Sequence, residues 1–582
     1  MSTSRAEVAA RLATGAPLDD CILQSQSLAG QSLVGTSLVR AKLFDVDFTG
    51  TDLSSAKLAG AVLVRCRLDG ARLDGADLTG ARLAQSTLDG ASLLGATLAG
   101  LLVADSSLRG AKLDGTRLER AALVNSHLEQ ASLVDAVFEQ ATVLGCWLDG
   151  ANLTGATLRA SAFTGSHLRG ALFRGAKLTQ ALLRDADLRD VDMSDATVDM
   201  VNFAGADLRG ATLARTMHMA VFDGAVLGDR SLAGTDLTGS ELDQRDLSGA
   251  DLRGANLSMC SLIGADLRGA KLSGARFERA LLSRCNLAGA DLRDVELGSV
   301  VLDGANLRGV NLAGCNLELS TLSDADLSDA DLSGAKLERA TLERTNLSRA
   351  NLRGTQFLSS LLNAAVLDDA KLTGASFFAV LLNGTALANV ALTDARFEAC
   401  SFVEADLSRR DLSRGKFIRC DFSRAKLAGS SLRDAELDGA TFQGTDLAGA
   451  TLVGASAAGA FFGEAALEAT CFSGANLRYA TFTGATLGRA TFDRADLRDA
   501  MLERVQARGA SFQAARLEHA NLAYADVEGA DFTDAALTGA ELHALRDRAA
   551  RFSPGARALA RGDDRERLEA EAWQPPADRT RT

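Results

Sequence analysis

The sequence has no long apolar run, few prolines and few aromatic residues. A membrane-spanning helix needs roughly 20 consecutive apolar residues, and no segment approaches that length. The first residues, MSTSRAEVAARL, lack the basic start and apolar centre of a signal peptide. Proline occurs four times and is absent between Pro17 and Pro554. We therefore expect a cytoplasmic protein without a membrane span.

Positive charge is also in short supply. The chain has 62 Lys and Arg residues against 75 Asp and Glu residues, which gives a net charge of −13. A protein that binds nucleic acid or an anionic membrane needs clustered basic side chains. We therefore expect no direct contact with nucleic acid.

The residue types that usually build catalytic and metal sites are scarce or scattered. The five His residues do not cluster, and the nine Cys residues show no C-x-x-C spacing. The only Gly-Lys pair, at 415 and 416, is followed by Phe417, so it is not a phosphate-binding P-loop. We expect a non-enzymatic protein with no cofactor and no metal.

What the sequence has in abundance is a five-residue repeat. In residues 264–293, Leu or Phe stands at 267, 272, 277, 282, 287 and 292. A helix would bury every 3.6th residue and a strand every second one, so neither element explains this spacing. We call the apolar residue position i. Ala, Ser, Thr or Cys dominates i−2, polar residues dominate i−1 and i+1, and Gly is common at i+2.

This pattern predicts one side of a coil. Positions i and i−2 point inward, and a turn at i+1 and i+2 redirects the chain. Gly at i+2 fits a type II turn, whose third residue has positive φ. Eight of the nine Cys residues occupy i−2, so we expect them to be small buried core residues.

The phenylalanines indicate how many sides a coil has, because many of them recur at intervals of twenty residues. Rings stacked in the core would give this interval if each coil holds four five-residue sides. About 105 units then form about 26 coils, and strands spaced by roughly 4.8 Å give a rod about 125 Å long. The predicted core ladders are Phe357, Phe377, Phe397 and Phe417; Phe402, Phe422, Phe442, Phe462 and Phe482; and Phe472, Phe492, Phe512 and Phe532.

The runs A-D-L-R-G, A-N-L-S-M and T-D-L-T-G resemble the A-(D/N)-L-x-x unit of the pentapeptide repeat family. The resemblance covers about nine-tenths of the chain. It implies an all-β fold, the right-handed quadrilateral β-helix. Fold and function are separable, so the resemblance does not fix a single role.

The repeat divides the chain into segments, and the ends of a solenoid need covers to protect their strand edges. Ser4 and Glu7 form a capping-box pattern at the N-terminal cap. We expect a fold with short helical caps at both ends. Its segments are a capping helix and lead-in (1–20), the first phase of the repeat (21–213), a one-residue phase slip (214–221), the second phase (222–542), a helical cap read from HALRDRAARF and the following residues (543–573), and a disordered tail (574–582).

Two sets of outward-facing residues are candidate binding surfaces. His127, Trp147 and His167 occupy i−1 at intervals of twenty, which predicts a stacked aromatic patch. Trp is enriched at binding hot spots, so this patch could anchor a partner. The alternative is a chance group of aromatic residues on a β-surface.

The second candidate is an apolar stripe along one side of the coils. About half of its i−1 positions are apolar, and exposed apolar patches usually mark contacts. The alternative is a strand-rich face covered by long neighbouring side chains. The predicted stripe residues are Val221, Leu281, Val301, Leu361, Leu381, Phe461 and Met501.

These features favour a rod-shaped, non-enzymatic protein-protein interaction scaffold with an unidentified protein partner; a homodimer through the stripe is one option. The family resemblance implies two alternatives. One is a DNA-mimicking regulator or protector of type II topoisomerase (DNA gyrase), and the other is an accessory or cargo component of a bacterial secretion system. Charge argues against mimicry, because 125 Å of duplex DNA carries about 74 negative charges, whereas this chain has a net −13.

Overall fold

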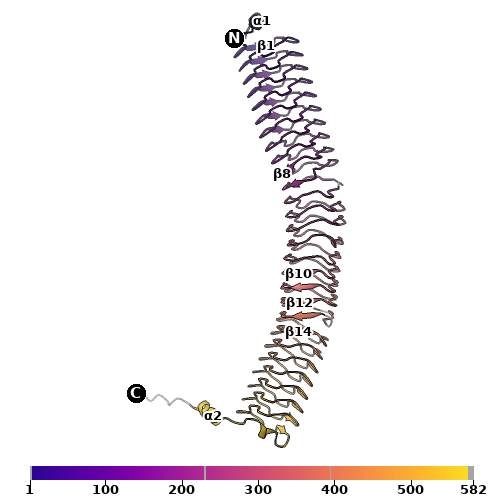
Figure 1. Cartoon of the computed structure of the whole chain (residues 1–582), viewed down its shortest axis with the longest axis vertical. Helices are drawn as coiled ribbons and strands as arrows, with labels where there is room; N and C mark the ends of the chain where they lie inside the picture. The colour runs from indigo at the N-terminus through magenta and orange to yellow at the C-terminus, as the bar shows by residue number, and fades with distance from the viewer. Residues whose placement is uncertain (1–2, 229–230, 388, 393–394, 574–582) are drawn as a thin grey trace, which may run out of the picture. The chain divides into compact units, whose positions relative to one another are not determined.

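The computed structural model describes residues 3–228, 231–387, 389–392 and 395–573. The chain is a parallel β-solenoid of about 26 turns, so the quadrilateral β-helix predicted from the repeat is confirmed (Figure 1). It consists of two compact units, Met1–Asn286 with Asp294–Glu296, and Leu287–Arg293 with Leu297–Thr582. Among the described residues, no helix combines the length and apolar character that crossing a bilayer requires.

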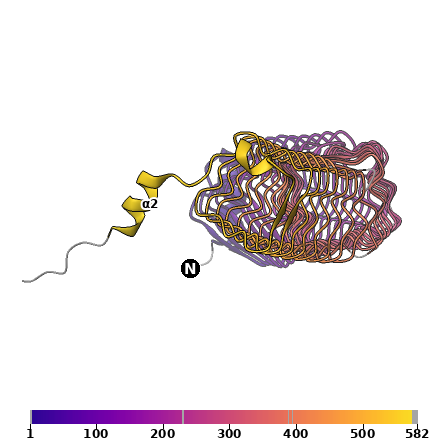
Figure 2. The same cartoon turned by 90° about the horizontal axis from the view of Figure 1, so that it is seen from below.

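Each coil buries the residues that the repeat places inward. Ala61 and Leu63, at i−2 and i, are both 0% exposed. Neighbouring coils pair in parallel, as Lys42 pairs with Val62, and the Val62 N–H donates to the Ala41 carbonyl at 2.9 Å. Figure 2 looks along the stack of coils and shows the backbone of the orange and yellow coils winding around a common interior.

Most corners are tight turns of the expected kind. At one of them the Ala61 N–H donates to the Leu58 carbonyl at 2.9 Å, and Gly60 at i+2 has φ of 67°. A positive φ at the third residue is the mark of a type II turn, and glycine adopts it without a steric cost. The corner geometry therefore favours Gly at i+2, although other residues also adopt it, as Ser55 does with φ of 56°.

In the first unit, one side of the coil forms a regular seven-stranded parallel sheet in the order β1 to β7. Each strand has three residues and buries only the middle one. The strands are β1 (Ile22–Gln24), β2 (Lys42–Phe44), β3 (Val62–Val64), β4 (Arg82–Ala84), β5 (Leu102–Ala104), β6 (Ala122–Val124) and β7 (Thr142–Leu144).

Buried serines accompany the extension of β3, β4, β5 and β7 through i+1. At these corners the backbone N–H of the next i−2 residue donates a hydrogen bond to a side-chain oxygen of the following coil. The Ser86 N–H donates to Ser106 Oγ at 3.1 Å, and the Ser106 N–H donates to Ser126 Oγ at 3.2 Å. Each hydroxyl in turn donates to a strand carbonyl, as Ser106 does to Ala104 at 2.8 Å. Polar groups buried at the corner are thus satisfied without the turn hydrogen bond.

The phase slip of the first unit lies where the sequence places it. β8 (Val198–Asp199) pairs with β9 (Met217–His218), and Val198 faces Met217 across nineteen residues in place of twenty. The next side is offset in the same way, since Asn202 pairs with Val221. The side assignments therefore continue through the slip.

The second unit contains a five-stranded parallel sheet and a short closing pair. The sheet has the order β10 (Lys336–Glu338), β11 (Gln356–Leu358), β12 (Ser376–Phe378), β13 (Arg396–Glu398) and β14 (Lys416–Ile418). The closing pair is β15 (Asp531–Phe532) with β16 (Arg551–Phe552).

Phenylalanine ladders fill the core of the second unit. Phe357 and Phe377 stack at 4.5 Å between ring centroids, and Phe442 lies between Phe422 at 5.2 Å and Phe462 at 4.8 Å. Rings of different ladders meet edge to face, as Phe472 and Phe482 do at 5.9 Å. Stacked and edge-on rings at these separations add attraction beyond the burial of their area.

Both ends of the chain carry a helix, but the C-terminal end differs from the expectation. α1 (Arg5–Thr14) is capped by Ser4, which accepts a hydrogen bond from the Glu7 N–H, and buries Val8. Residues 543–552 form no helix, because Phe552 continues the repeat and stacks on Phe532 at 4.9 Å. The 3₁₀-helix η1 (Ala556–Leu559) and α2 (Arg565–Ala572) follow, and residues 574–582 lie outside the described residues.

Polar side chains take the place of a further coil at this end. The Asp534 N–H donates to Ser553 Oγ at 2.7 Å, and the Ala544 N–H donates to Asp563 Oδ1 at 2.8 Å. Both residues occupy i+2, whose N–H normally donates to a carbonyl of the next coil. The cap therefore satisfies edge groups that would otherwise be open to another chain.

Candidate functional site

The outer surface of the seven-stranded sheet is a regular, mainly apolar surface of the first unit. We call it the unit 1 sheet face. It consists of the first and last residues of each strand, of which ten out of fourteen are apolar. The apolar members are Ile22, Val62, Leu102, Ala122, Phe44, Val64, Ala84, Ala104, Val124 and Leu144.

The outward side chains of this face are half-buried or exposed. Leu102 and Leu144 are each 37% exposed, and Val62 and Val64 are half-buried. The register places each side chain next to its neighbour on the adjacent strand, as Val124 faces Leu144. The result is two parallel apolar rows rather than isolated exposed residues.

Two cations interrupt the apolar rows. Lys42 and Arg82 are both exposed and occupy the same row on either side of Val62. Within the described part of the chain, neither side chain forms an ion pair. Other basic residues nearby are paired, as Arg65 is with Asp45 at 2.7 Å. The face therefore carries positive charge without its own counter-charge.

The predicted aromatic patch lies on the adjoining side of the same unit. Trp147 stacks between His127 at 4.4 Å and His167 at 5.6 Å, with interplanar angles of 12° and 7°. His127 Nδ1 is 2.9 Å from Glu129 Oε1 and 3.0 Å from Arg109 Nη2. The flat faces of the three rings pack against one another, so the Trp147 indole exposes only its edge.

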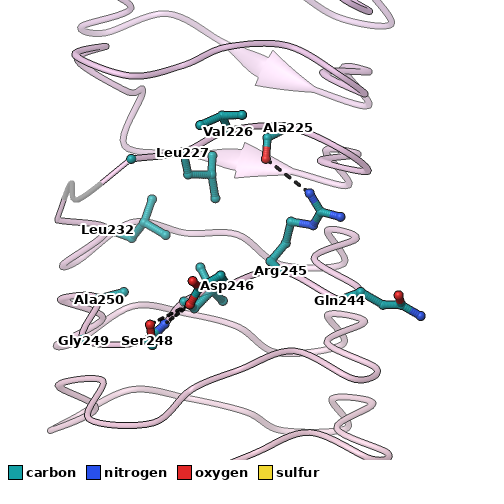
Figure 3. A pocket seen from close by; sticks show the side chains of 12 residues that line it. Ala225, Val226, Leu227, Leu232, Gln244, Arg245, Asp246, Ser248, Gly249 and Ala250 are labelled. Carbon is teal, nitrogen blue, oxygen red and sulfur yellow. Dashed lines mark hydrogen bonds between the residues drawn. The ribbon is translucent and has the colours of Figure 1, made fainter.

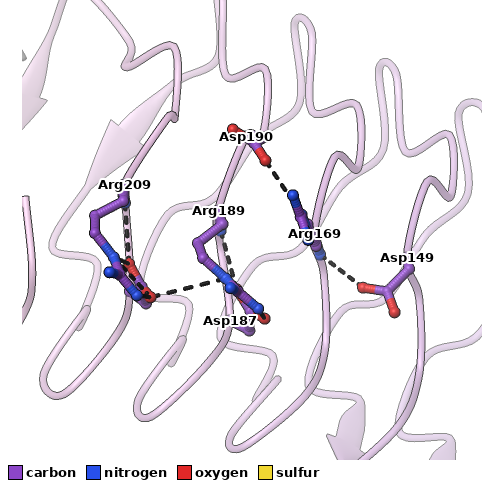
Figure 4. A network of polar contacts seen from close by, with 7 residues as sticks. Asp149, Arg169, Asp187, Arg189, Asp190 and Arg209 are labelled. Carbon is purple, nitrogen blue, oxygen red and sulfur yellow. Dashed lines mark hydrogen bonds and ion pairs between the residues drawn. The ribbon is translucent and has the colours of Figure 1, made fainter. Parts of the chain in front are cut away.

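The column that carries Trp147 continues into a lattice of ion pairs (Figure 4). Arg189 contacts Asp187 at 2.5 Å and reaches toward Asp207 at 3.8 Å, while Arg209 holds Asp207 at 2.5 Å. Hydrogen bonds from Arg189 and Arg209 lower the pKa values of the Asp187 and Asp207 carboxyls. Both carboxylates stay ionised but neutralised, so this surface does not concentrate negative charge.

The predicted stripe residues occupy equivalent i−1 positions in the two units. In the first unit Val221 is half-buried and Leu281 is 40% exposed. In the second unit Val301 and Leu361 are half-buried, whereas Leu381, Phe461 and Met501 are 37% to 39% exposed. Leu361 pairs directly with Leu381, but Thr441 and Thr481 precede the other two exposed residues in the ladder.

The sequence analysis missed the apolar residues at i+1. In the second unit, Leu358 pairs with Phe378 on the five-stranded sheet, and Phe378 is 47% exposed. These residues stand one corner before Leu361 and Leu381 in the chain. A repeat whose i+1 residue is apolar and whose i+2 residue is not glycine is the signal that identifies such positions.

A cleft of about 630 Å³ in the first unit lies beside an arginine at an inward position (Figure 3). Arg245 occupies i−2, where a small residue is usual, and its side chain is 18% exposed. It donates to the Ala225 carbonyl at 3.2 Å and to the Asp243 carbonyl at 3.0 Å. Asp246 accepts hydrogen bonds from the Ser248 N–H and hydroxyl. Arg245 and Asp246 thus form hydrogen bonds within the protein rather than pointing toward a ligand.

Arg245→Ala is expected to stabilise the first unit. The Ala225 carbonyl would become free to accept the Asp246 N–H, as the Arg245 carbonyl accepts the Asp266 N–H at 2.9 Å one coil further on. A gained ladder hydrogen bond is worth about 1 kcal/mol. Hydrogen exchange of the Asp246 amide and denaturant unfolding measure this. Faster exchange and a lower free energy of unfolding would contradict it.

Eight of the nine cysteines are buried, and Cys471 is half-buried. Burial raises the pKa of the Cys66 thiol to about 11 and that of Cys260 to about 12. Thiols with such pKa values are poor nucleophiles and poor metal ligands at neutral pH. Among the residues that the structure describes, no three His, Cys, Asp or Glu side chains gather in a way that could hold a metal ion.

Comparison with known families agrees with this repeat. A profile described as pentapeptide repeats (8 copies) matches thirteen segments, which cover residues 21–101, 104–210, 220–258, 340–377 and 416–544, and one described as a pentapeptide repeat region matches residues 275–352. Together the matches cover more than half of the chain. The chain belongs to the pentapeptide repeat family.

This pentapeptide repeat protein is similar to several solved structures. QnrB1, a plasmid-mediated fluoroquinolone resistance protein, is 20% identical, with a TM-score of 0.20 over 33% of this chain and 93% of its own. HetL, from the cyanobacterium Nostoc and involved in heterocyst differentiation regulation, is 24% identical, with a TM-score of 0.11 over 58% and 96%. Rfr23 from the cyanobacterium Cyanothece is 27% identical, with a TM-score of 0.14 over 22% and 94%. No curated protein matches the chain.

Proposed function

We propose that this pentapeptide repeat protein is a non-catalytic scaffold in the cytoplasm that binds a protein partner through the unit 1 sheet face. The observation that carries the proposal is the composition of that face, with ten apolar side chains out of fourteen on seven consecutive strands. Monomeric proteins rarely expose contiguous apolar surfaces of this kind unless they mark a contact.

In this proposal, other surfaces make smaller contributions to partner binding. Trp147 follows Leu144 around the corner from the face, so the aromatic patch forms part of its rim. In the second unit, Leu358, Phe378, Leu361 and Leu381 supply a second, smaller contact surface. The remaining stripe residues are separated by polar side chains and contribute less.

The alternative roles receive less support from the surface. A DNA mimic needs dense, unneutralised negative charge, whereas Asp187 and Asp207 are paired with arginines. A homodimer through the sheet face would bury Lys42 and Arg82 against a surface without carboxylates, because the face itself has none. Among the residues that the structure describes, no surface feature selects a role in a secretion system.

Affinity capture with three matched baits tests the proposal. The wild type is compared with a face variant, Leu102→Glu with Leu144→Glu, and with a control variant, Leu94→Glu with Leu172→Glu. All four leucines lie in the first unit and are 37% to 41% exposed, but Leu94 and Leu172 lie on another side of the coil. The two variants therefore add equal charge to different surfaces.

We expect a protein that is captured from lysate of the source organism by the wild type and the control variant but lost with the face variant. Circular dichroism must show that both variants keep the fold. Equal capture by all three baits would overturn the assignment of the face, as would equal loss with both variants.

A further inference from the structure

The charges on the unit 1 sheet face restrict the kind of partner that can cover it. Lys42 and Arg82 stand in one row with Val62 between them, and the residues around them on the face are apolar or uncharged. Covering the face removes both cations from water, and burying an unpaired charge is costly. A partner that covers the whole face must therefore bring carboxylates to these two positions.

The backbone of the sheet offers nothing for a partner to pair with. The N–H groups of Lys42, Val62 and Arg82 donate to carbonyls of the preceding coil at 2.7 Å, 2.9 Å and 2.8 Å. An extended segment lying on the face would leave its own backbone groups without partners. A helix satisfies its backbone internally and packs on a sheet through side chains alone.

The spacing of the two cations fits one helix face. Adjacent strands are roughly 4.8 Å apart, so Lys42 and Arg82, two strands apart, are separated by about 10 Å along the stack. Helix residues seven positions apart lie on the same face and are separated by about 10.5 Å along the axis. The helix positions three and four residues after the first carboxylate lie between the two carboxylates and face Val62.

We propose that the partner element is an amphipathic helix with an apolar face and acidic residues seven positions apart, which pair with Lys42 and Arg82. The seven strands span about 29 Å, which corresponds to about 19 helical residues. This inference rests on the proposed function and names the chemistry of the partner.

A displayed library of 19-residue helices tests the proposal on the full chain. The apolar face of the helix is fixed, and two positions seven residues apart are randomised to Glu, Lys or Gln. Helices are selected on the wild type after removal of those that bind the Leu102→Glu, Leu144→Glu variant. A second selection uses Lys42→Glu with Arg82→Glu, which reverses the charge of both cations.

We expect the wild type to enrich Glu at both positions by at least tenfold over Lys, and the charge-reversed chain to enrich Lys. Enrichment of Gln or Lys on the wild type, the same preference on both chains, or no enrichment of any helix would overturn the proposal. The outcome of the capture experiment is independent of the outcome of the library selection. If capture depends on the face but the library does not favour Glu, the scaffold stands and the partner chemistry is wrong.

Discussion

Phe442→Asp is expected to unfold the coils around it and to lower the free energy of unfolding by more than about 4 kcal/mol. Phe442 is fully buried and stacked between Phe422 and Phe462. Loss of a buried Phe costs about 3 to 5 kcal/mol, and a carboxylate in the same place adds the penalty of a buried charge. Coils of a solenoid support only their neighbours, so the damage is local but severe.

Denaturant unfolding followed by circular dichroism, with limited proteolysis to locate the damage, measures this effect. Phe442→Leu is the matched control, because Leu is the usual occupant of position i, and we expect it to cost about 1 to 2 kcal/mol. An Asp variant with the melting temperature and protease resistance of the wild type would show that Phe442 is not in the core.

Removal of residues 551–582 is expected to make the chain associate end to end. The truncation deletes β16 and exposes the ring of Phe532. It also frees the Ala530 and Ala540 carbonyls, which accept the N–H groups of Arg551 and Arg561 at 2.8 Å. An open strand edge beside an apolar core is a template for another chain. Light scattering should report a molar mass that rises with protein concentration.

A shorter truncation serves as the control for this result. Removal of residues 574–582 leaves β16, η1 and the Asp563 contact to Ala544 in place. We expect its molar mass to be independent of concentration over the same range. The capping account is wrong if both truncated chains behave alike and melt at the temperature of the full chain.

The architecture follows from the sequence because the repeat is local and unbroken. A five-residue period specifies one side of a coil, and phenylalanines twenty residues apart, such as Phe357 and Phe377, specify four sides. The missing residue near Met217 was visible as a change of phase and appears as the nineteen-residue register of β8 and β9. Hydrophobic periodicity alone carries this information.

The outer surface was harder to predict, because it depends on the type of corner. The sequence analysis assigned i+1 to a turn at every corner and so overlooked Val64, Val124 and Leu144. At the corners after Val64 and Leu144, the N–H groups of Cys66 and Cys146 donate to Ser86 Oγ and Ser166 Oγ of the following coil, which is a contact between coils and not a local preference. A serine twenty residues after the next i−2 position, as Ser86 is after Cys66 and Ser166 after Cys146, is the available signal.

The C-terminal segment shows a similar limit. The residues HALRDRAARF have a helical composition, yet Phe552 stands twenty residues after Phe532 and joins its ladder. The stacking of Phe552 on Phe532 outweighed the helix propensity of these residues. The spacing of a single phenylalanine was the better guide.

The most direct test of the sheet face as a binding surface is a calorimetric titration of the captured partner against the wild type, the face variant and the control variant. We expect Leu102→Glu with Leu144→Glu to weaken binding by at least about 100-fold, which corresponds to about 2.7 kcal/mol. Leu94→Glu with Leu172→Glu should bind within about twofold of the wild type. Wild-type affinity in the face variant, or an equal loss in both variants, would contradict the account.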